Sequence, residues 1–300
     1  MELHQLRSFI AIAEEKNLTR ASERLFLSQS AVSAHLKSLE DALGVTLFSR
    51  TAKGMQLTPE GMTLLERARS LLDSANAMLQ EAKSLSGELR GTLKIGFNTD
   101  PNFLRVADLS TRMRQAYPDI ELRLVQAMTT EVLDSVQRGE MDGGFTFGST
   151  ANPALTVLEL ASVPLHIVGP AKWKSVLDSA DMRALAGMPW VWVPPSCPFH
   201  NLLDGRFAEQ GLTLKRVVET DHEDILRALV IAGEGVSILR KAEAEELERL
   251  GRVAIWRGME IAIPLGFAHK ASRDEDPLIR ATVQTVLGIW RAAAFDGEDS

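Results

Sequence analysis

The chain has a single cysteine among its 300 residues, so it cannot form an internal disulfide bond. Because disulfide bonds are typical of secreted proteins, their exclusion favours the cytoplasm. The sequence also lacks any apolar run of the ~18 residues that a membrane-spanning helix needs. Residues 1–20 carry Glu2, Glu14 and Glu15 where a signal peptide would have a basic start and an apolar core. We therefore expect a cytoplasmic protein.

The common signatures of catalytic and metal sites are missing as well. The six histidines show no metal-ligand spacing, and no serine lies in a G-x-S-x-G motif. The G-x-G at Gly233–Gly235 follows a predicted helix, where a turn is the simpler interpretation. One alternative would suit an enzyme, an acid–base group made of His200, Asp221, His222 and Glu223. We expect a protein that is not an enzyme and that holds no metal or cofactor.

Net positive charge, the usual mark of a DNA-binding domain, is scarce. The whole chain carries −7. Residues 1–58 hold seven basic and six acidic side chains, a balance of +1, which leaves −8 for residues 59–300. With 45% hydrophobic residues, the chain can bury sizeable cores, and it is long enough for two or three domains of ~100–200 residues. DNA binding would depend on where a few basic side chains lie, and we expect a modest salt dependence per protomer.

The N-terminal region contains two short helical patterns separated by a tight turn, within residues 18–50. The second pattern has one apolar stripe, because four residues recur at helical spacing: Val32, Leu36, Leu39 and Leu43. Ser28 precedes it as a predicted N-cap, and its opposite face is polar. Residues 19–26 form the first pattern, and a predicted helix at 3–15 supplies a third wall of the core. Three helices with a tight turn before the last are typical of a helix-turn-helix domain that reads DNA.

The same region resembles the N-terminal domain of LysR-type transcriptional regulators. The resemblance covers Met1 to about Leu65 and rests on LRSFIAIAEEKNLTRASERL, SQSAVS, LGVTLFSR and LTPEG. It implies a winged helix-turn-helix domain at residues 1–58. The side chains that it implies at the DNA are Gln29, Ser30 and Ser33 against base edges, and Lys37, Arg50 and Lys53 against phosphates or the minor groove. The sequence departs from the family at Ser30, where proline is common, and at Ala34, where a basic residue is frequent.

Between Pro59 and about Leu85 the sequence predicts one long helix, with Thr58 as its cap and Pro59 at its first position. Its apolar residues form a heptad seam: Leu65, Ala68, Leu72, Ala75, Leu79 and Ala82. A second stripe beside the seam consists of Leu64, Leu71, Met78 and Leu85. We predict a linker and dimerisation helix at residues 59–88, in which a second copy is contacted by Leu65, Ala68, Leu72, Ala75 and Leu79. The alternative is a helix that lies on the core of its own domain.

From Thr92 onward, strand and helix patterns alternate, which predicts parallel sheets with helices on both faces. The expected elements include a helix from Asp100 to Ala116 and a closing helix from Asp276 to Ala294. The layout of residues 91–300 resembles the two-lobed, periplasmic-binding-protein-like effector domain of the same family.

The first lobe is expected at about 91–160 and 266–300, and the second at about 161–265. The chain would cross between the lobes near 148–153 and 263–266. The predicted fold class is therefore a multi-domain α+β protein. A winged helix-turn-helix, a long linker helix and an α/β two-lobed effector domain follow one another along its chain.

Ligands of open parallel sheets bind beyond the carboxyl ends of the strands, where helix N-termini point amide hydrogens into a cleft. That rule and the resemblance select these effector-binding residues: Asn98, Thr99, Asp100, Thr129, Phe147, Ser196, Cys197 and His200. The polar members have helix capping as a plain alternative. A carboxylate at Asp100 would disfavour an anionic effector. Cys197 has two interpretations, a redox-sensitive thiol at a helix start or a small residue of the cleft wall.

The predicted function is a homo-oligomeric transcriptional regulator whose activity is set by a small molecule bound between two lobes. Its expected partners are double-stranded operator DNA, a small-molecule effector whose identity the sequence leaves open, a second copy in a dimer or tetramer, and RNA polymerase. Two alternatives stay open, a cytoplasmic small-molecule receptor and an enzyme of the solute-binding fold.

Overall fold

The computed structural model describes residues 1–51, 54–85 and 89–296. The chain divides into two compact units, Met1–Glu88 with Glu275–Pro277 and Leu89–Asp274 with Leu278–Ser300. The main hydrophobic cores follow this division, one formed by residues 6–68 and the other by residues 93–289. None of the described helices has both the length and the apolarity to span a bilayer.

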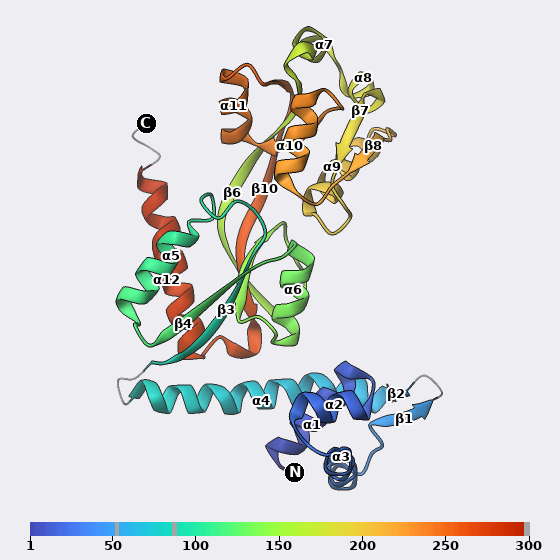
Figure 1. The fold of residues 1–300 in the computed structure, drawn as a ribbon, viewed down its shortest axis with the longest axis vertical. Helices are drawn as coiled ribbons and strands as arrows, with labels where there is room; N and C mark the ends of the chain where they lie inside the picture. The colour runs from blue at the N-terminus through green and yellow to red at the C-terminus, as the bar shows by residue number, and fades with distance from the viewer. Residues whose placement is uncertain (52–53, 86–88, 297–300) are drawn as a thin grey trace. The chain divides into compact units, whose positions relative to one another are not determined.

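The first unit contains the three predicted N-terminal helices, an antiparallel hairpin and a long helix (Figure 1). Its elements are α1 (Leu3–Glu15), α2 (Leu18–Leu25), α3 (Gln29–Leu43), β1 (Phe48–Thr51), β2 (Gly54–Leu57) and α4 (Pro59–Leu85). Before α2, the Asn17 side chain accepts hydrogen bonds from the amides of Thr19 and Arg20. Before α3, Ser28 accepts one from the amide of Ala31, which confirms its predicted role as N-cap.

The apolar stripe of α3 is buried over three of its four predicted members, Val32, Leu36 and Leu39. They pack in one core with Phe9 and Ile12 of α1 and with Ala21 of α2, whose small side chain lets the helices approach. Leu43 is 37% exposed, against expectation. It belongs to the last turn of α3, which ends at Gly44 in the left-handed region (φ 71°) and lies outside that core.

The second unit alternates strands and helices in two lobes (Figure 1). The first part of its chain forms β3 (Gly91–Phe97), α5 (Val106–Ala116), β4 (Ile120–Gln126), α6 (Thr129–Arg138), β5 (Gly143–Phe147) and β6 (Leu155–Pro170). The middle part forms α7 (Lys174–Ser179), α8 (Met182–Gly187), β7 (Pro189–Trp192), α9 (Pro198–Ala208) and β8 (Lys215–Glu219). The last part forms α10 (Glu223–Ala232), β9 (Ser237–Arg240), α11 (Lys241–Arg249), β10 (Val253–Lys270) and α12 (Pro277–Asp296).

The larger sheet of this unit is mixed, which corrects the expectation of parallel sheets, whereas the smaller sheet is parallel as expected. One six-stranded sheet has the order β4-β3-β5-β10-β6-β9, and a two-stranded sheet pairs β7 with β8. Within the larger sheet, β3 is parallel to β4 and β5, whereas β10 is antiparallel to β5 and β6. In the first lobe α6 covers one face, and α5 and α12 lie on the other (Figure 1).

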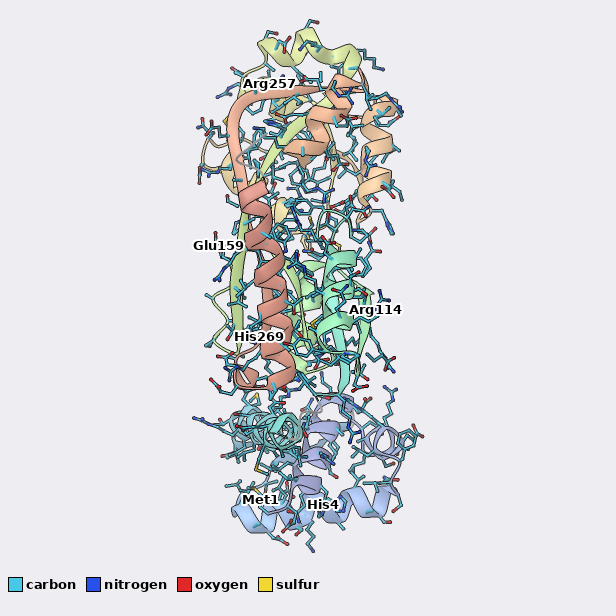
Figure 2. All side chains as sticks on the ribbon, turned by 90° about the vertical axis from the view of Figure 1, so that its left-hand side faces the viewer. Met1, His4, Arg114, Glu159, Arg257 and His269 are labelled. Atoms are coloured by element: carbon cyan, nitrogen blue, oxygen red, sulfur yellow. The ribbon has the colours of Figure 1, made fainter. Side chains whose placement is uncertain are left out.

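The two lobes are joined by a long ribbon of β6 and β10, which pair from Val253–Pro170 to Lys270–Leu155. Figure 2 shows Arg257 and His269 toward opposite ends of β10. The chain therefore crosses inside these two strands, and the expected crossing near 148–153 is wrong, because that segment precedes β6.

The segment after β3 also differs from its prediction. Residues 101–105 form a turn, and α5 begins at Val106 instead of Asp100. Arg105 adopts a left-handed φ of 55°, which an α-helix cannot contain, so the turn and the helix are separate. Asp100 accepts a hydrogen bond from the Asn102 amide at 2.8 Å and closes this turn. The turn places polar groups at the end of β3, where the candidate site lies.

Candidate functional site

The exposed face of α3 carries most of the polar side chains that the sequence predicts at DNA. Gln29, Ser30 and Lys37 are exposed, and Ser33 is half-buried. Ser30 lies at the first turn, where its hydroxyl is 3.0 Å from that of Ser28. Since the opposite face of the helix is buried, these side chains are held on a rigid element and face outward. This arrangement suits contacts with base edges and phosphates in a major groove.

The hairpin of β1 and β2 follows α3 as a wing. Its backbone is anchored to the helices, because the Met55 amide donates to the Lys16 carbonyl at 3.0 Å. Gly54 has a φ of 112°, and a Cβ at this position would lie 2.5 Å from the same carbonyl, so only glycine fits. Arg50 belongs to β1, but its side chain and the whole of Lys53 lie outside the described residues.

Two histidines link α1 to α3, a contact that the sequence did not predict. The rings of His4 and His35 lie 4.5 Å apart in an edge-on arrangement, and the Nδ1 of His35 is 2.9 Å from the Ser8 hydroxyl. Desolvation and the nearby His4 lower the pKa of His35. His35 is half-buried beside the apolar stripe, a position that its spacing from Leu36 and Leu39 could have revealed.

The predicted seam of α4 divides into two parts. Its first half packs on the core of its own unit: Ala68 is 4% exposed, and Leu65 and Leu72 are partly buried there. Ala75 is half-buried, and Leu79 is 55% exposed. Among the described side chains of the helix, Ala82 of the seam and the larger Met62, Leu71 and Met78 are exposed as well. The alternative of a helix on its own core thus describes the first half of the seam, and the second half leaves apolar surface free.

Between the lobes of the second unit, Thr99 joins two charged groups. This residue follows β3 in the first lobe and is 3% exposed. Its hydroxyl donates to the Oε1 of Glu223 at 2.6 Å and accepts from the Nη1 of Arg240 at 2.7 Å. Glu223 begins α10 and Arg240 ends β9, both in the second lobe. One threonine therefore connects the lobes through a charged network in which Thr99 and Arg240 are buried and Glu223 is partly exposed.

The rest of this network holds Arg240 in place. Its Nη2 donates to Glu243 at 3.1 Å and lies 3.6 Å from Glu223, and its guanidinium covers the ring of Phe103 at 4.6 Å. Glu243 also pairs with Arg227 at 2.8 Å. Burial raises the pKa of the Glu223 carboxyl, although Arg240 and the Thr99 hydrogen bond act in the opposite direction.

Three cavities lie along the lobe contact. The inner one has a volume of about 50 Å³, and its walls include Asn98, Thr129, Phe147, Cys197, Phe199 and Glu223. A groove of about 640 Å³ opens on one side and is lined by Asn98, Thr99 and Asp100 with residues of α10. A second groove, of about 360 Å³, is lined by Thr129, Phe147 and Ser196 with neighbours from β10. With the exception of His200, the predicted effector residues are thus brought to one region but distributed over three cavities that share lining residues.

His200 is the predicted residue that lines none of these three cavities. Its side chain is buried in the second lobe, where Trp192 donates to its Nδ1 at 2.8 Å and Asp204 lies 3.1 Å from its Nε2. Arg216 pairs with Asp204 and stacks over the Trp192 ring at 4.7 Å. The structure gives His200 a role in holding α9 to β7. Among the described residues the recorded partners of His200 are Trp192, Val193 and Asp204, and no recorded contact joins it to Asp221, His222 or Glu223.

Cys197 lies at the N-cap of α9 and lines the inner cavity. Burial raises the pKa of its thiol from a usual value of 9.0 to about 11. Since the thiolate is the reactive form, this position suits a wall residue better than a redox sensor. The chain has no second cysteine to resolve an oxidised sulfur.

Sequence reasoning missed Arg240 and Glu243 and considered Glu223 for an enzyme alone. The signal was present, because Arg240 is the last residue of a buried strand and Glu223 begins a helix, positions like those that selected Thr99 and Thr129. The rule of strand ends selects Arg240 as well, because β9 ends there.

Comparison with known proteins gives two matching family models. Residues 3–62 match "Bacterial regulatory helix-turn-helix protein, lysR family", and residues 86–290 match "LysR substrate binding domain". The HTH-type transcriptional regulator IlvR of Caulobacter vibrioides is 32% identical over 256 residues, which cover 84% of this chain and 86% of that protein.

Solved structures of full length share the fold. ArgP from Mycobacterium tuberculosis aligns with a TM-score of 0.71 at 21% identity, over 95% of this chain and 96% of that one. A full-length OxyR variant from Pseudomonas aeruginosa aligns with a TM-score of 0.70 at 23% identity, over 95% of this chain and 94% of that one.

Proposed function

The chain belongs to the LysR family of DNA-binding transcriptional regulators, and we propose specific residues for its operator and effector contacts. In this proposal residues 1–58 bind DNA, residues 59–88 link and dimerise, and residues 91–300 respond to the effector. The protein acts in the cytoplasm without enzymatic activity, on operator DNA and together with RNA polymerase.

The DNA-binding part of the proposal rests on the two faces of α3, one polar and exposed and the other apolar and buried. Gln29 and Ser30 are exposed at the N-terminal end of the helix, while Val32, Leu36 and Leu39 are buried on its other side. The N-terminal residues of a recognition helix are those that reach base edges in the major groove. We assign base contacts to Gln29, Ser30 and Ser33, and phosphate or minor-groove contacts to Lys37, Arg50 and Lys53.

The operator contacts can be tested with two matched variants. Gln29→Ala removes a side chain that reads a base, so it should weaken operator binding by about 1–3 kcal/mol and leave nonspecific binding nearly intact. Lys37→Ala should weaken operator and nonspecific DNA alike and should lower the slope of affinity against salt. Fluorescence anisotropy with the operator and a scrambled duplex measures both. Operator binding by Gln29→Ala at the parent's affinity would contradict the assigned base contact.

The effector part of the proposal places a small molecule in the inner cavity and its adjoining groove. This placement of the ligand rests on Thr99, Thr129 and Glu223. They lie at the starts of helices or the ends of strands, and they come from both lobes. Asn98, Asp100, Phe147 and Cys197 complete the walls. A ligand that binds one lobe arrangement more tightly shifts the equilibrium by that difference in affinity.

Self-association completes the proposal. Met78 and Leu79 expose apolar surface on the second half of α4, and Leu71 does so next to the middle of the helix. Exposed apolar side chains grouped on one helix are typical of protein contacts, and a second copy of α4 offers the same surface. Leu65, Ala68 and Leu72 then support the helix from within the protomer.

A further inference from the structure

We propose that the effector is a small organic cation whose ammonium or guanidinium group is held by Asp221 and Glu223. This inference rests on the proposed function, because it concerns the chemistry of the same cleft. It follows from the distribution of charge around the cavities, the free acceptor capacity of two carboxylates, an unpaired amide and the volumes.

The groove of about 640 Å³ is strongly acidic. Five carboxylates line it: Asp100, Glu131, Asp221, Glu223 and Asp224. Its one arginine, Arg227, is already matched, at 2.9 Å from Asp224 and 2.8 Å from Glu243. The groove of about 360 Å³ has no charged residue in its described lining. The negative charge is therefore concentrated on one side of the lobe contact, where it attracts cations and repels anions.

Each of the five carboxylates keeps an oxygen without a recorded hydrogen-bond partner among the described residues, but of the five only Asp221 and Glu223 line both the groove and the inner cavity. The Oε1 of Glu223 accepts from Thr99, but its Oε2 is 3.6 Å from the Arg240 Nη2, beyond hydrogen-bond distance. Asp221 has the imidazole of His222 as its recorded ion-pair partner among the described residues, at 3.9 Å. Both side chains line the groove and the inner cavity, so they face the same entering group. A ligand that donates hydrogen bonds and carries positive charge satisfies both.

The negative charge of the Glu223 carboxylate is also only partly compensated by the cations around it. Burial raises the pKa of its carboxyl even though Arg240 is close. Arg240 shares its guanidinium among Thr99, Glu243 and the ring of Phe103, which limits its compensation of Glu223. A second cation beside Glu223 would favour its ionised form.

Asn98 supplies an independent sign of a polar ligand. Its Nδ2 donates to the Thr129 hydroxyl at 2.6 Å, while its Oδ1 is buried and has no hydrogen-bond partner among the described residues. Turning the amide over would exchange the two ends and still leave one unpaired. Asn98 lines both the groove and the inner cavity. Because buried polar atoms are rarely left without partners, a polar group of the ligand is expected here.

The cavity volumes limit the size and shape of the ligand. The groove lies within the ~300–1,000 Å³ of typical small-molecule sites. The inner cavity, at about 50 Å³, is a third of the ~150 Å³ cavity that admits benzene. Its apolar walls, which include Phe147, Phe199 and Leu226, accept a short aliphatic segment without rearrangement. An aliphatic amine or guanidine therefore fits better than an aromatic acid.

The proposal can be tested by calorimetry on the full-length protein at low ionic strength. The cationic probes are 1,4-diaminobutane and L-arginine, and the anionic probes are succinate and benzoate. We expect the cations to bind, the anions not to bind, and added salt to weaken the cation affinity. Asp221→Asn and Glu223→Gln should each raise the dissociation constant about tenfold or more. Glu209→Gln, an exposed carboxylate outside the three cavities, should bind as the parent does.

Several outcomes would overturn the proposal. Binding of the anions alone, or of neither class, contradicts it, and so does cation binding that both variants leave unchanged. Asp221 is exposed, so Asp221→Asn remains informative even if Glu223→Gln fails to fold. Operator binding is measured on the same samples. A parent protein that binds cations but no operator refutes the proposed function and leaves the cation site standing.

Discussion

Thr99 shows how one buried hydroxyl can decide whether two charges are stable inside a protein. Arg240 is buried at 8% exposure, and a guanidinium in that position needs hydrogen-bond acceptors around it. Thr99 supplies one acceptor from the opposite lobe and at the same time donates to Glu223. Its methyl group and short side chain fit the space, and the hydroxyl alone makes both hydrogen bonds.

Replacing that hydroxyl gives a stability prediction. Thr99→Val keeps the shape and removes both hydrogen bonds, so it should lower the free energy of unfolding by about 1–3 kcal/mol. Thr130→Val is the matched control, because Thr130 is exposed and its bond to the Ser196 carbonyl is long at 3.5 Å. Urea denaturation of both variants measures the difference. Equal stability of the two would show that the hydroxyl of Thr99 contributes nothing to the lobe contact.

Cys197 gives a second prediction about one residue. Its pKa of about 11, against a usual 9.0, lowers the thiolate fraction about 100-fold at neutral pH. Iodoacetamide at pH 8 should therefore alkylate the folded protein far more slowly than the urea-unfolded protein, as followed by mass spectrometry. Cys197→Ser, which has no thiol, sets the background. Alkylation of the folded chain at the unfolded rate would revive the redox interpretation.

Among the elements, α4 has two groups of apolar side chains. One group packs on the core of its own unit, and the other is exposed. Ala68, which is 4% exposed, belongs to the packed group, and Met78, which is 67% exposed, belongs to the exposed group. Met78→Asp should leave the free energy of unfolding within about 0.5 kcal/mol, yet lower the mass seen by light scattering and weaken operator binding. Ala68→Asp buries an unpaired charge and should destabilise the protein by about 3 kcal/mol or more. If Met78→Asp kept the parent's mass, the second half of α4 would not be the contact between copies.

The elements that the sequence predicts well are those with local signals. The sequence pattern predicts a helix from Thr129 to a stop at Gly139 and another that starts at Pro198, and the structure has the start and C-cap of α6 and the start of α9 at these residues. Within the long ribbon, the sequence pattern by itself predicts only two short strands, at 165–168 and 261–267. The first half of β6 is only partly buried, so its pattern is weak, and its pairing with β10 depends on residues far away in the chain. The late start of α5 depends on one left-handed residue, Arg105, which no periodicity reveals.

Residues of the candidate site could likewise be predicted where their signal is local. Helix starts and strand ends could be selected from the sequence, and Asn98, Thr99 and Thr129 do line the cavities. Their partners could not be paired in advance, since Thr99 and Arg240 are 141 positions apart. The expected role of His200 failed because its ring is used by Trp192 and Asp204 within the second lobe.

At the scale of the whole molecule, the network around Thr99 links ligand binding to the lobe arrangement. Thr99, Glu223 and Arg240 hold the lobes together while the inner cavity is only about 50 Å³. A ligand larger than this space must change the lobe contact in order to enter. Binding energy and lobe movement are thereby coupled, which is what a regulator requires from its effector domain.

Reporter assays can show which side of the lobe contact receives the effector. Thr129 accepts hydrogen bonds from Asn98 and from the Phe147 amide and lines both the inner cavity and the groove of about 360 Å³, whereas Ser196 lines that groove without reaching the inner cavity. Thr129→Val should therefore abolish the effector response, and Thr129→Ser, which keeps the hydroxyl, should restore it. Ser196→Ala should respond like the parent. Operator binding without effector should be unchanged in all three, because the lost coupling, typically ~1–3 kcal/mol, is expressed only when ligand is present. A response lost in Ser196→Ala and kept in Thr129→Val would move the effector to the groove of about 360 Å³, away from the carboxylates of Asp221 and Glu223.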